Sequence, residues 1–240
     1  MKQTYVYAHR GSSGTHPENT LAAFRAAIQC GADGIELDVQ MTKDGEVVVI
    51  HDEQVDRTTN GEGWICDMTY AQLATLDAGS WFDPAFSNEQ IPTLNNVLTI
   101  CKDTNVMINI ELKNDRIRYE GMEKLVVQKV RDYHMEKQVV LSSFFHESLT
   151  VVHRLAPELE TAILYERPLR EPWKQAIECH ATAIHAPKQF VSSGYIIQAK
   201  KYRQAIRVFT VNIEKEMKEL CEMKVDAIIT DFPEQAIQIL

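Results

Sequence analysis

The sequence predicts a (β/α)8 barrel, also called a TIM barrel, and three observations support this prediction. Eight strand-like segments alternate with segments whose apolar residues have helical spacing. The length of 240 residues is typical of one such barrel. Polar residues follow the strands at their carboxyl ends, where barrels build their active sites. An open doubly wound sheet is the alternative, but the first strand is not followed by the glycine-rich phosphate-binding loop of that fold.

The first predicted βα unit brings two polar residues to the end of a strand. Residues 5–9 form a short β-rich run that ends in His9, followed by Arg10. After a loop of small residues, residues 18–28 have helical spacing. Asn19 lies at the start of this helix, where it either caps the first turn or orders the loop beneath His9.

The stretch from residue 32 to residue 52 contains the most informative alternation in the chain. Apolar residues occupy one parity of its strand, and Glu36, Asp38 and Gln40 occupy the other. Because successive strand side chains point to opposite faces, Glu36 and Asp38 share one face. Two buried carboxylates repel each other and are costly to desolvate, so they take up a proton or bind a cation. We expect a metal ion there.

A second strand, over residues 106–112, repeats this pattern and adds Glu111, followed by Lys113. Three carboxylates, Glu36, Asp38 and Glu111, suit one hard divalent cation such as Mg²⁺ or Ca²⁺. The alternative is that they are ion-paired carboxylates on ordinary, half-exposed antiparallel strands.

The βα alternation is interrupted once and then continues to the end of the chain. Residues 52–92 combine turn residues with aromatic side chains, so we expect an inserted subdomain that shapes a substrate pocket, within a single domain over residues 1–240. A short helix is expected there over residues 69–76. Further helices are predicted over residues 94–102, 119–134, 146–155, 173–179, 193–201, 214–223 and 233–240, and further strands over residues 138–142, 160–164, 181–185, 206–211 and 227–230.

Composition restricts the possible partners. A formal net charge of −9 argues against nucleic acid or an anionic membrane as the main partner. The five scattered cysteines have no metal-type spacing and are typical of reduced thiols in a cytoplasmic protein. The sequence contains neither an apolar signal core nor a long apolar run, so we expect no classical secretion signal and no membrane insertion. It leaves the oligomeric state open.

Two histidines, His9 and His51, follow strands in neighbouring βα units and are the candidate proton-transfer groups. In phosphodiester cleavage one such group removes a proton from the attacking oxygen, and the other protonates the leaving alkoxide. A metal, with Arg10 or Lys113, would stabilise the charge on the phosphoryl oxygens. No spacing assigns a role to His16 or His185, although either could reach the barrel mouth.

Residues 8–52, with their HRG, PENT, E-x-D and HD motifs, resemble the opening signature of the bacterial-type, soluble glycerophosphodiester phosphodiesterases. The later segments IPTLNNVL, INIELK, FTVN and IITDFPE resemble downstream blocks of that family in the same order. The resemblance implies a (β/α)8 barrel with a small insertion after the second strand. It also implies metal-dependent hydrolysis of glycerophosphodiesters to sn-glycerol 3-phosphate and an alcohol. The implied roles are His9 and His51 as the acid–base pair, Glu36, Asp38 and Glu111 as metal ligands, and Arg10 and Lys113 as phosphate-binding residues.

One departure and several alternatives remain. The family usually has tryptophan where this chain has Phe209, which alters the apolar wall of the substrate site. A lysophospholipase D acting on single-chain lipids and a non-catalytic glycerophosphate-binding protein are the competing functions. The preferred alcohol and the choice between Mg²⁺ and Ca²⁺ stay open. So does the nucleophile, which is either the neighbouring hydroxyl of the substrate, giving a cyclic phosphate, or water.

Overall fold

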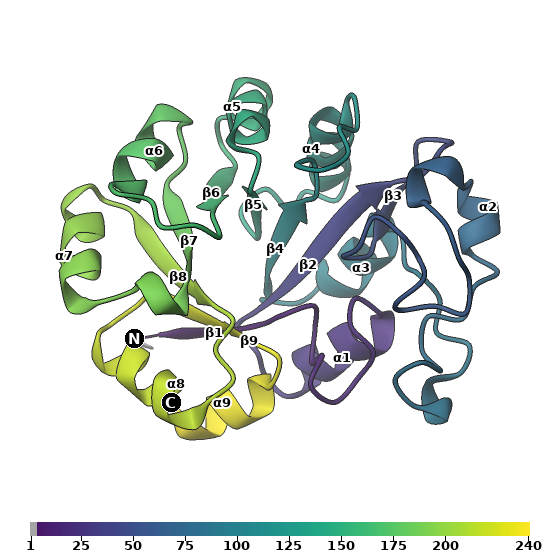
Figure 1. The fold of residues 1–240 in the computed structure, drawn as a ribbon, viewed down its shortest axis with the longest axis horizontal. Coiled ribbons are helices and arrows are strands. Elements are labelled where there is room, and N and C mark those ends of the chain that lie inside the picture. Colours follow the sequence, from purple (N-terminus) through teal and green to yellow (C-terminus); the bar gives the residue numbers. More distant parts are fainter. Residues whose placement is uncertain (1–3) are drawn as a thin grey trace.

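The computed structural model describes residues 4–240 and confirms the (β/α)8 barrel (Figure 1). Within these residues, β1 pairs with β9 on one side and with β2 on the other, so the ring of parallel strands closes. The strands of the ring are β1 (Tyr5–Ala8), β2 (Gly34–Met41), β4 (Met107–Leu112), β5 (Val139–Ser143), β6 (Glu160–Leu164), β7 (Ala183–Pro187), β8 (Ala205–Phe209) and β9 (Ala227–Thr230).

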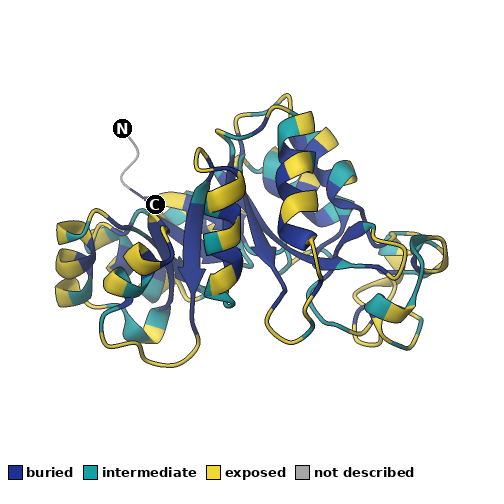
Figure 2. Cartoon of the chain, turned by 90° about the horizontal axis from the view of Figure 1, so that it is seen from above, coloured by how far each residue is buried: buried dark blue, intermediate teal, exposed yellow. Residues whose placement is uncertain are grey.

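Helices surround this ring, and each buries one face against it. Figure 2 shows buried residues along the strands and on the inner sides of the helices, with exposed residues on the outer sides. The helices are α1 (Leu21–Gln29), α3 (Leu94–Cys101), α4 (Met122–Asp132), α5 (His146–Leu155), α6 (Pro172–Glu178), α7 (Ser193–Lys201), α8 (Glu214–Glu222) and α9 (Pro233–Ile239).

Along β2 and β4, apolar side chains on one face pack against the helices, and the side chains on the other face point into the barrel interior. Ile35, Leu37, Ile108 and Ile110 are fully buried in one apolar cluster that also contains Phe24 of α1. The side chains between them belong to the opposite face of each strand, because strand side chains alternate. The predicted polar face of β2 therefore points into the barrel.

A short extra strand, β3 (Val47–Val49), pairs antiparallel with the carboxyl-terminal half of β2. The segment that follows, residues 52–92, contains η1 (Ile65–Asp67), α2 (Tyr70–Leu73) and η2 (Pro84–Phe86) and lies beside β3 (Figure 1). Val48 of β3 shares a separate buried cluster with Val55, Ile65 and Leu73. The apolar residues of the segment thus pack against β3 and against one another.

Several predicted element boundaries differ from those of the structure. The short helix expected over residues 69–76 spans only Tyr70–Leu73, and the strand expected over residues 181–185 spans Ala183–Pro187. The helix expected from residue 119 begins at Met122, because Gly121 precedes it with a φ of +82°, a left-handed conformation that ends a right-handed helix. The strand expected over residues 206–211 ends at Phe209, where its pairing with β7 stops. No helix within residues 4–240 combines the length and the apolar character that crossing a bilayer requires.

Candidate active site

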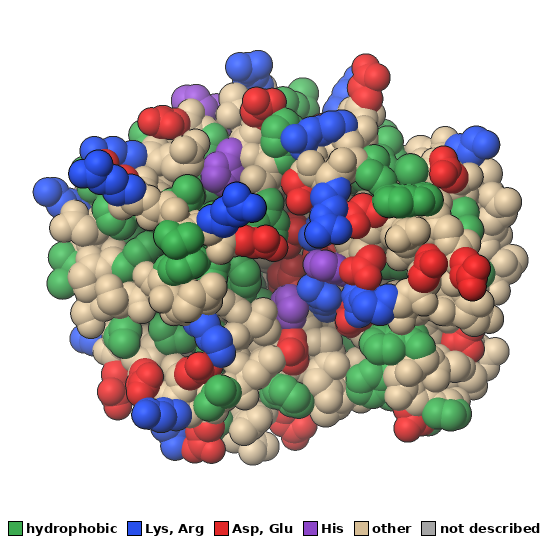
Figure 3. Space-filling view, in the orientation of Figure 1, with side chains coloured by type: hydrophobic (Ala, Val, Ile, Leu, Met, Phe, Trp, Pro, Cys, Tyr) green, Lys and Arg blue, Asp and Glu red, His purple; other side chains and the backbone are tan. Residues whose placement is uncertain are grey.

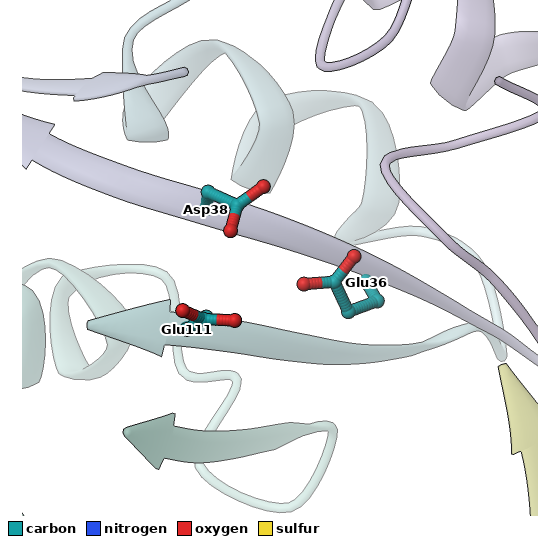
Figure 4. Close-up of side chains that lie close together, drawn as sticks. All are labelled: Glu36, Asp38 and Glu111. Carbon is teal, nitrogen blue, oxygen red and sulfur yellow. The ribbon is translucent and has the colours of Figure 1, made fainter. Parts of the chain in front are cut away.

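Three carboxylates from two adjacent strands meet inside the barrel (Figure 4). Glu36 and Asp38 lie on β2 and Glu111 lies on β4, where the strand register places Glu111 opposite Asp38. One oxygen from each lies within 4.8 Å of the others. Their exposed fractions are only 4%, 1% and 8%, so water screens their repulsion poorly.

The charges of this acidic group are only partly balanced by the protein. Burial, and then the neighbouring Asp38 and Glu111, hold the pKa of Glu36 well above its ordinary value. Burial raises the pKa of Glu111 to about 7, although the adjacent Lys113 opposes this shift. For Asp38, burial is outweighed by Arg10, His51 and Lys113, and its pKa is lowered. Three closely spaced carboxylate oxygens with two raised pKa values form a donor set that fits a hard divalent cation.

Asn19 supports this group directly. Its Nδ2 donates to Asp38 Oδ2 at 2.9 Å, and its backbone has a φ of +57°. The helix is capped instead by Thr20, whose side chain accepts a hydrogen bond from the Ala23 backbone N–H. The prediction that Asn19 caps the helix is therefore wrong. Its side chain instead forms a hydrogen bond with Asp38.

His9, after β1, is oriented by a residue from the far end of the chain. Its Nδ1 lies 2.6 Å from Asp231 Oδ1, just after β9. Asn212 Nδ2 and Ser13 Oγ also donate to Asp231, at 2.5 Å and 3.1 Å. Although burial alone would raise the pKa of Asp231, these hydrogen bonds lower it, so its carboxylate stays ionised beside His9. Nε2 is then the ring nitrogen available to the cavity.

His51 is oriented in the same way by its sequence neighbour. Its Nδ1 lies 2.6 Å from Asp52 Oδ1, and Lys113 Nζ lies 3.3 Å from its Nε2. Since a lysine ammonium can only donate, Nε2 accepts this hydrogen bond and the ring proton lies on Nδ1. Burial, with Arg10 and Lys113, lowers the pKa of His51 despite the opposing charge of Asp38. His51 is thus a neutral imidazole whose Nε2 carries no proton.

Two cations flank the acidic group. The Arg10 backbone N–H donates to Glu36 Oε2 at 2.9 Å, and its Nη1 donates to Glu18 Oε1 at 2.8 Å. Lys113 Nζ donates to Glu111 Oε1 at 2.9 Å. Burial opposes both charges, but the neighbouring carboxylates outweigh it and raise the pKa of each, so both side chains remain positive.

These groups line one cavity of about 490 Å³ at the centre of the barrel. Figure 3 shows histidine, acidic and basic side chains gathered around a hollow in the middle of this face. An apolar part of the wall comes from Phe144, Leu164, Phe209 and Ile229. Phe209, which takes the place of the usual tryptophan, packs edge-to-face on Phe144 with ring centroids 6.4 Å apart.

All of the predicted site residues except Asp38 line this cavity, and Asp38, only 1% exposed, lies beside Glu36 and Glu111. Of the two unassigned histidines, His16 packs on Phe86 with ring centroids 5.2 Å apart. His185 lines the cavity, fully buried between Asn109 and Arg207, and burial holds its pKa well below the ordinary value.

Sequence reasoning assigned no role to Asp52, Asp231, Glu18 or Arg57, although all four contact predicted site residues or their partners. Asp52 adjoins His51 in the sequence and could have been found from the HD pair. Asp231 gives no such local signal, because 222 positions separate it from His9.

Together these features define a (β/α)8-barrel protein with a candidate metal and acid–base centre. Residues 9–235 match the model of the glycerophosphoryl diester phosphodiesterase family, and the chain belongs to this family. A glycerophosphodiester phosphodiesterase of Caldanaerobacter subterraneus subsp. tengcongensis is 43% identical over 240 residues, covering 99% of this chain and 98% of that protein. A second, from Bacillus altitudinis, is 42% identical over 244 residues, covering 98% of both.

Solved structures of phosphodiesterases have the same fold as this chain. A phosphodiesterase of Oleispira antarctica, in complex with the product sn-glycerol-3-phosphate, has a TM-score of 0.91 at 30% identity, covering 98% of this chain and 96% of that one. The glycerophosphodiester phosphodiesterase of Agrobacterium tumefaciens has a TM-score of 0.87 at 33% identity, covering 98% and 99%.

Proposed function

We propose that the protein hydrolyses glycerophosphodiesters to sn-glycerol 3-phosphate and an alcohol with the help of one divalent metal ion. The observation that carries the proposal is the meeting, in one cavity of a family member, of three buried carboxylates and two histidines, each histidine oriented by an aspartate. The product bound to the Oleispira antarctica relative supports the glycerophosphate half of the substrate.

Glu36, Asp38 and Glu111 would hold the metal, and Mg²⁺ and Ca²⁺ both suit oxygen donors. When bound, the ion would supply positive charge that stabilises the phosphoryl oxygens. Arg10 and Lys113 would bind the same phosphate, because both are cations at the cavity.

The two histidines would divide the proton transfers. His51 Nε2 carries a lone pair and would accept the proton of the attacking hydroxyl, whether this belongs to the substrate's own glycerol or to water. His9, whose Nδ1 is held by Asp231, would donate a proton from Nε2 to the leaving alkoxide. Asp52 and Asp231 would hold each ring in the orientation that its role requires.

We also infer that residues 1–240 form one catalytic domain with residues 52–92 as an inserted subdomain, which the separate cluster around Val55 and Ile65 supports. A small-molecule substrate and a cytoplasmic location belong to the same proposal. The net charge of −9 and the free cysteines support them.

The test is incubation with a panel of glycerophosphodiesters that differ in the alcohol, in the presence of Mg²⁺ or Ca²⁺, with detection of sn-glycerol 3-phosphate. We expect release from several members of the panel. Cleavage confined to single-chain lysophospholipids would favour the lysophospholipase D alternative. Tight binding without turnover would instead identify a glycerophosphate-binding protein.

Lys113→Met should weaken binding of sn-glycerol 3-phosphate by about 10- to 100-fold, because it removes a charged hydrogen bond worth about 1.5–3 kcal/mol. Calorimetry on the metal-loaded protein would measure this, with inhibition by neutral glycerol as the control that should not change. If affinity for the phosphate is retained, Lys113 serves only as the partner of Glu111.

A further inference from the structure

Arg57, in the segment that follows His51, occupies an unusual position. Its guanidinium lies between two carboxylates that are 34 positions apart in the sequence, Glu18 and Asp52. Nε and Nη2 donate to Asp52 at 2.7 and 3.2 Å, and Nη1 and Nη2 donate to Glu18 at 2.8 and 2.7 Å. Both contacts are bidentate, the geometry in which a guanidinium fixes a carboxylate most firmly.

Each of these carboxylates also contacts a residue that has a role in the proposed reaction. Asp52 Oδ1 lies 2.6 Å from His51 Nδ1. Glu18 Oε1 accepts from Arg10 Nη1 at 2.8 Å. One chain of contacts therefore runs from His51 through Asp52, Arg57 and Glu18 to Arg10.

Arg57 also lines the cavity, so direct binding of substrate must be weighed. Four of its five N–H donors are already used by the two carboxylates. Arg10 differs, because within the described residues its side chain makes one hydrogen bond, from Nη1 to Glu18, and one longer ion pair, from Nε to Asp38 Oδ2 at 3.4 Å. A phosphate could therefore take two N–H donors of Arg10 and leave its bond to Glu18 in place, whereas bidentate binding to Arg57 would displace a carboxylate.

We propose that Arg57 is a positioning residue, which sets the orientation of His51 through Asp52 and of Arg10 through Glu18. This inference rests on the proposed function and extends it to a residue that touches neither substrate nor metal. It gives residues 52–92 a second task besides shaping the pocket, because Arg57 ties this segment to the loop after β1.

A purely structural role would give a different signature. The Arg57 side chain is 44% exposed, and exposed ion pairs contribute little to stability. Arg57→Gln should therefore shift the melting temperature by at most about 4 °C in a chain of this size. Loss of a partner that orients an active-site group, in contrast, typically costs about 10- to 100-fold in activity.

The first experiment is steady-state kinetics on a glycerophosphodiester. Arg57→Gln should lower kcat by about 10- to 100-fold with KM changed by less than about threefold. The kcat of Arg57→Lys should lie between those of Arg57→Gln and wild type, since an ammonium keeps the charge but cannot hold two carboxylates bidentately. Arg116→Gln is the matched control: it removes one positive charge from the cavity rim, where Arg116 is 77% exposed with a single 3.4 Å contact to Glu53, and its kcat should stay near normal.

A double-mutant cycle then tests the route. In an Asp52→Asn background, Arg57→Gln should cause less than its full loss, because the route to His51 is already weakened while the route through Glu18 to Arg10 is still intact. Fully additive losses, or a rise in KM at unchanged kcat, would overturn the proposal, and the latter would make Arg57 a substrate contact.

A second readout does not depend on turnover. The Nδ1 protons of His51 and His9 lie in short hydrogen bonds of 2.6 Å to Asp52 and Asp231, and such protons resonate downfield of the backbone amides. In Arg57→Gln the His51 signal should shift or broaden, and the His9 signal should not. Unchanged signals from both, or equal changes in both, would overturn the proposal. Wild-type protein that cleaves no diester would refute the proposed function, while these signals would still decide whether Arg57 orients His51.

Discussion

Replacing either His9 or His51 with alanine should lower kcat by about 10²–10⁴-fold, the usual contribution of one general acid or base. In the case of His51 the loss follows from removal of Nε2, the proposed proton acceptor. This nitrogen carries no proton, because it accepts a hydrogen bond from Lys113. In the case of His9 it follows from removal of the proposed proton donor, whose ring Asp231 holds through Nδ1. Both side chains are partly exposed, at 31% and 19% for His51 and His9, so neither substitution should unfold the barrel.

In the proposed reaction the two histidines act together, so the double variant should be barely slower than either single one. His16→Ala is the control, because His16 packs on Phe86 and does not line the cavity. Its kcat should stay near normal. A folded His51→Ala protein with near-normal kcat, checked by circular dichroism, would remove His51 from the mechanism.

Removing divalent metal with a chelator should abolish turnover, and adding Mg²⁺ or Ca²⁺ should restore it. The same ion should raise the melting temperature of the metal-free protein, because it binds the folded state and relieves repulsion among Glu36, Asp38 and Glu111. At a concentration about 100 times the dissociation constant, this binding stabilises the fold by about 2.7 kcal/mol.

The Glu36→Gln variant distinguishes the proposed metal site from the alternative, a set of ordinary ion-paired carboxylates. Glutamine keeps the size of the side chain and can still accept the hydrogen bond from the Arg10 backbone, but it removes one negative charge. The metal-free variant should be at least as stable as metal-free wild type, yet the metal-induced rise in melting temperature should be lost. Glu166→Gln, an exposed cavity residue, should keep the full rise. A Glu36→Gln protein with unchanged metal response and turnover would rule out the ligand set.

Much of this site could be predicted from sequence because strand periodicity is a local property. The alternation at residues 34–40 placed Glu36 and Asp38 on one face without any knowledge of the neighbouring strands. The same rule placed Glu111 and Lys113 together, and the count of alternating strands and helices predicted the barrel. Helix ends were less predictable, because the choice between Asn19 and Thr20 as the cap depends on whether Asp38 competes for the asparagine side chain.

The contacts between distant segments were decided by the tertiary structure alone. Strand register, set by the pairing of β2 with β4, places Asp38 opposite Glu111 and brings the carboxylates together. Closure of the ring at β1 and β9 brings Asp231 to His9 across 222 positions. The fold of residues 52–92 places Arg57 against Glu18. The sequence by itself determined which side chains share a face, since that depends on adjacent residues. Which faces meet depends on how the whole chain packs, and only the closed barrel decided it.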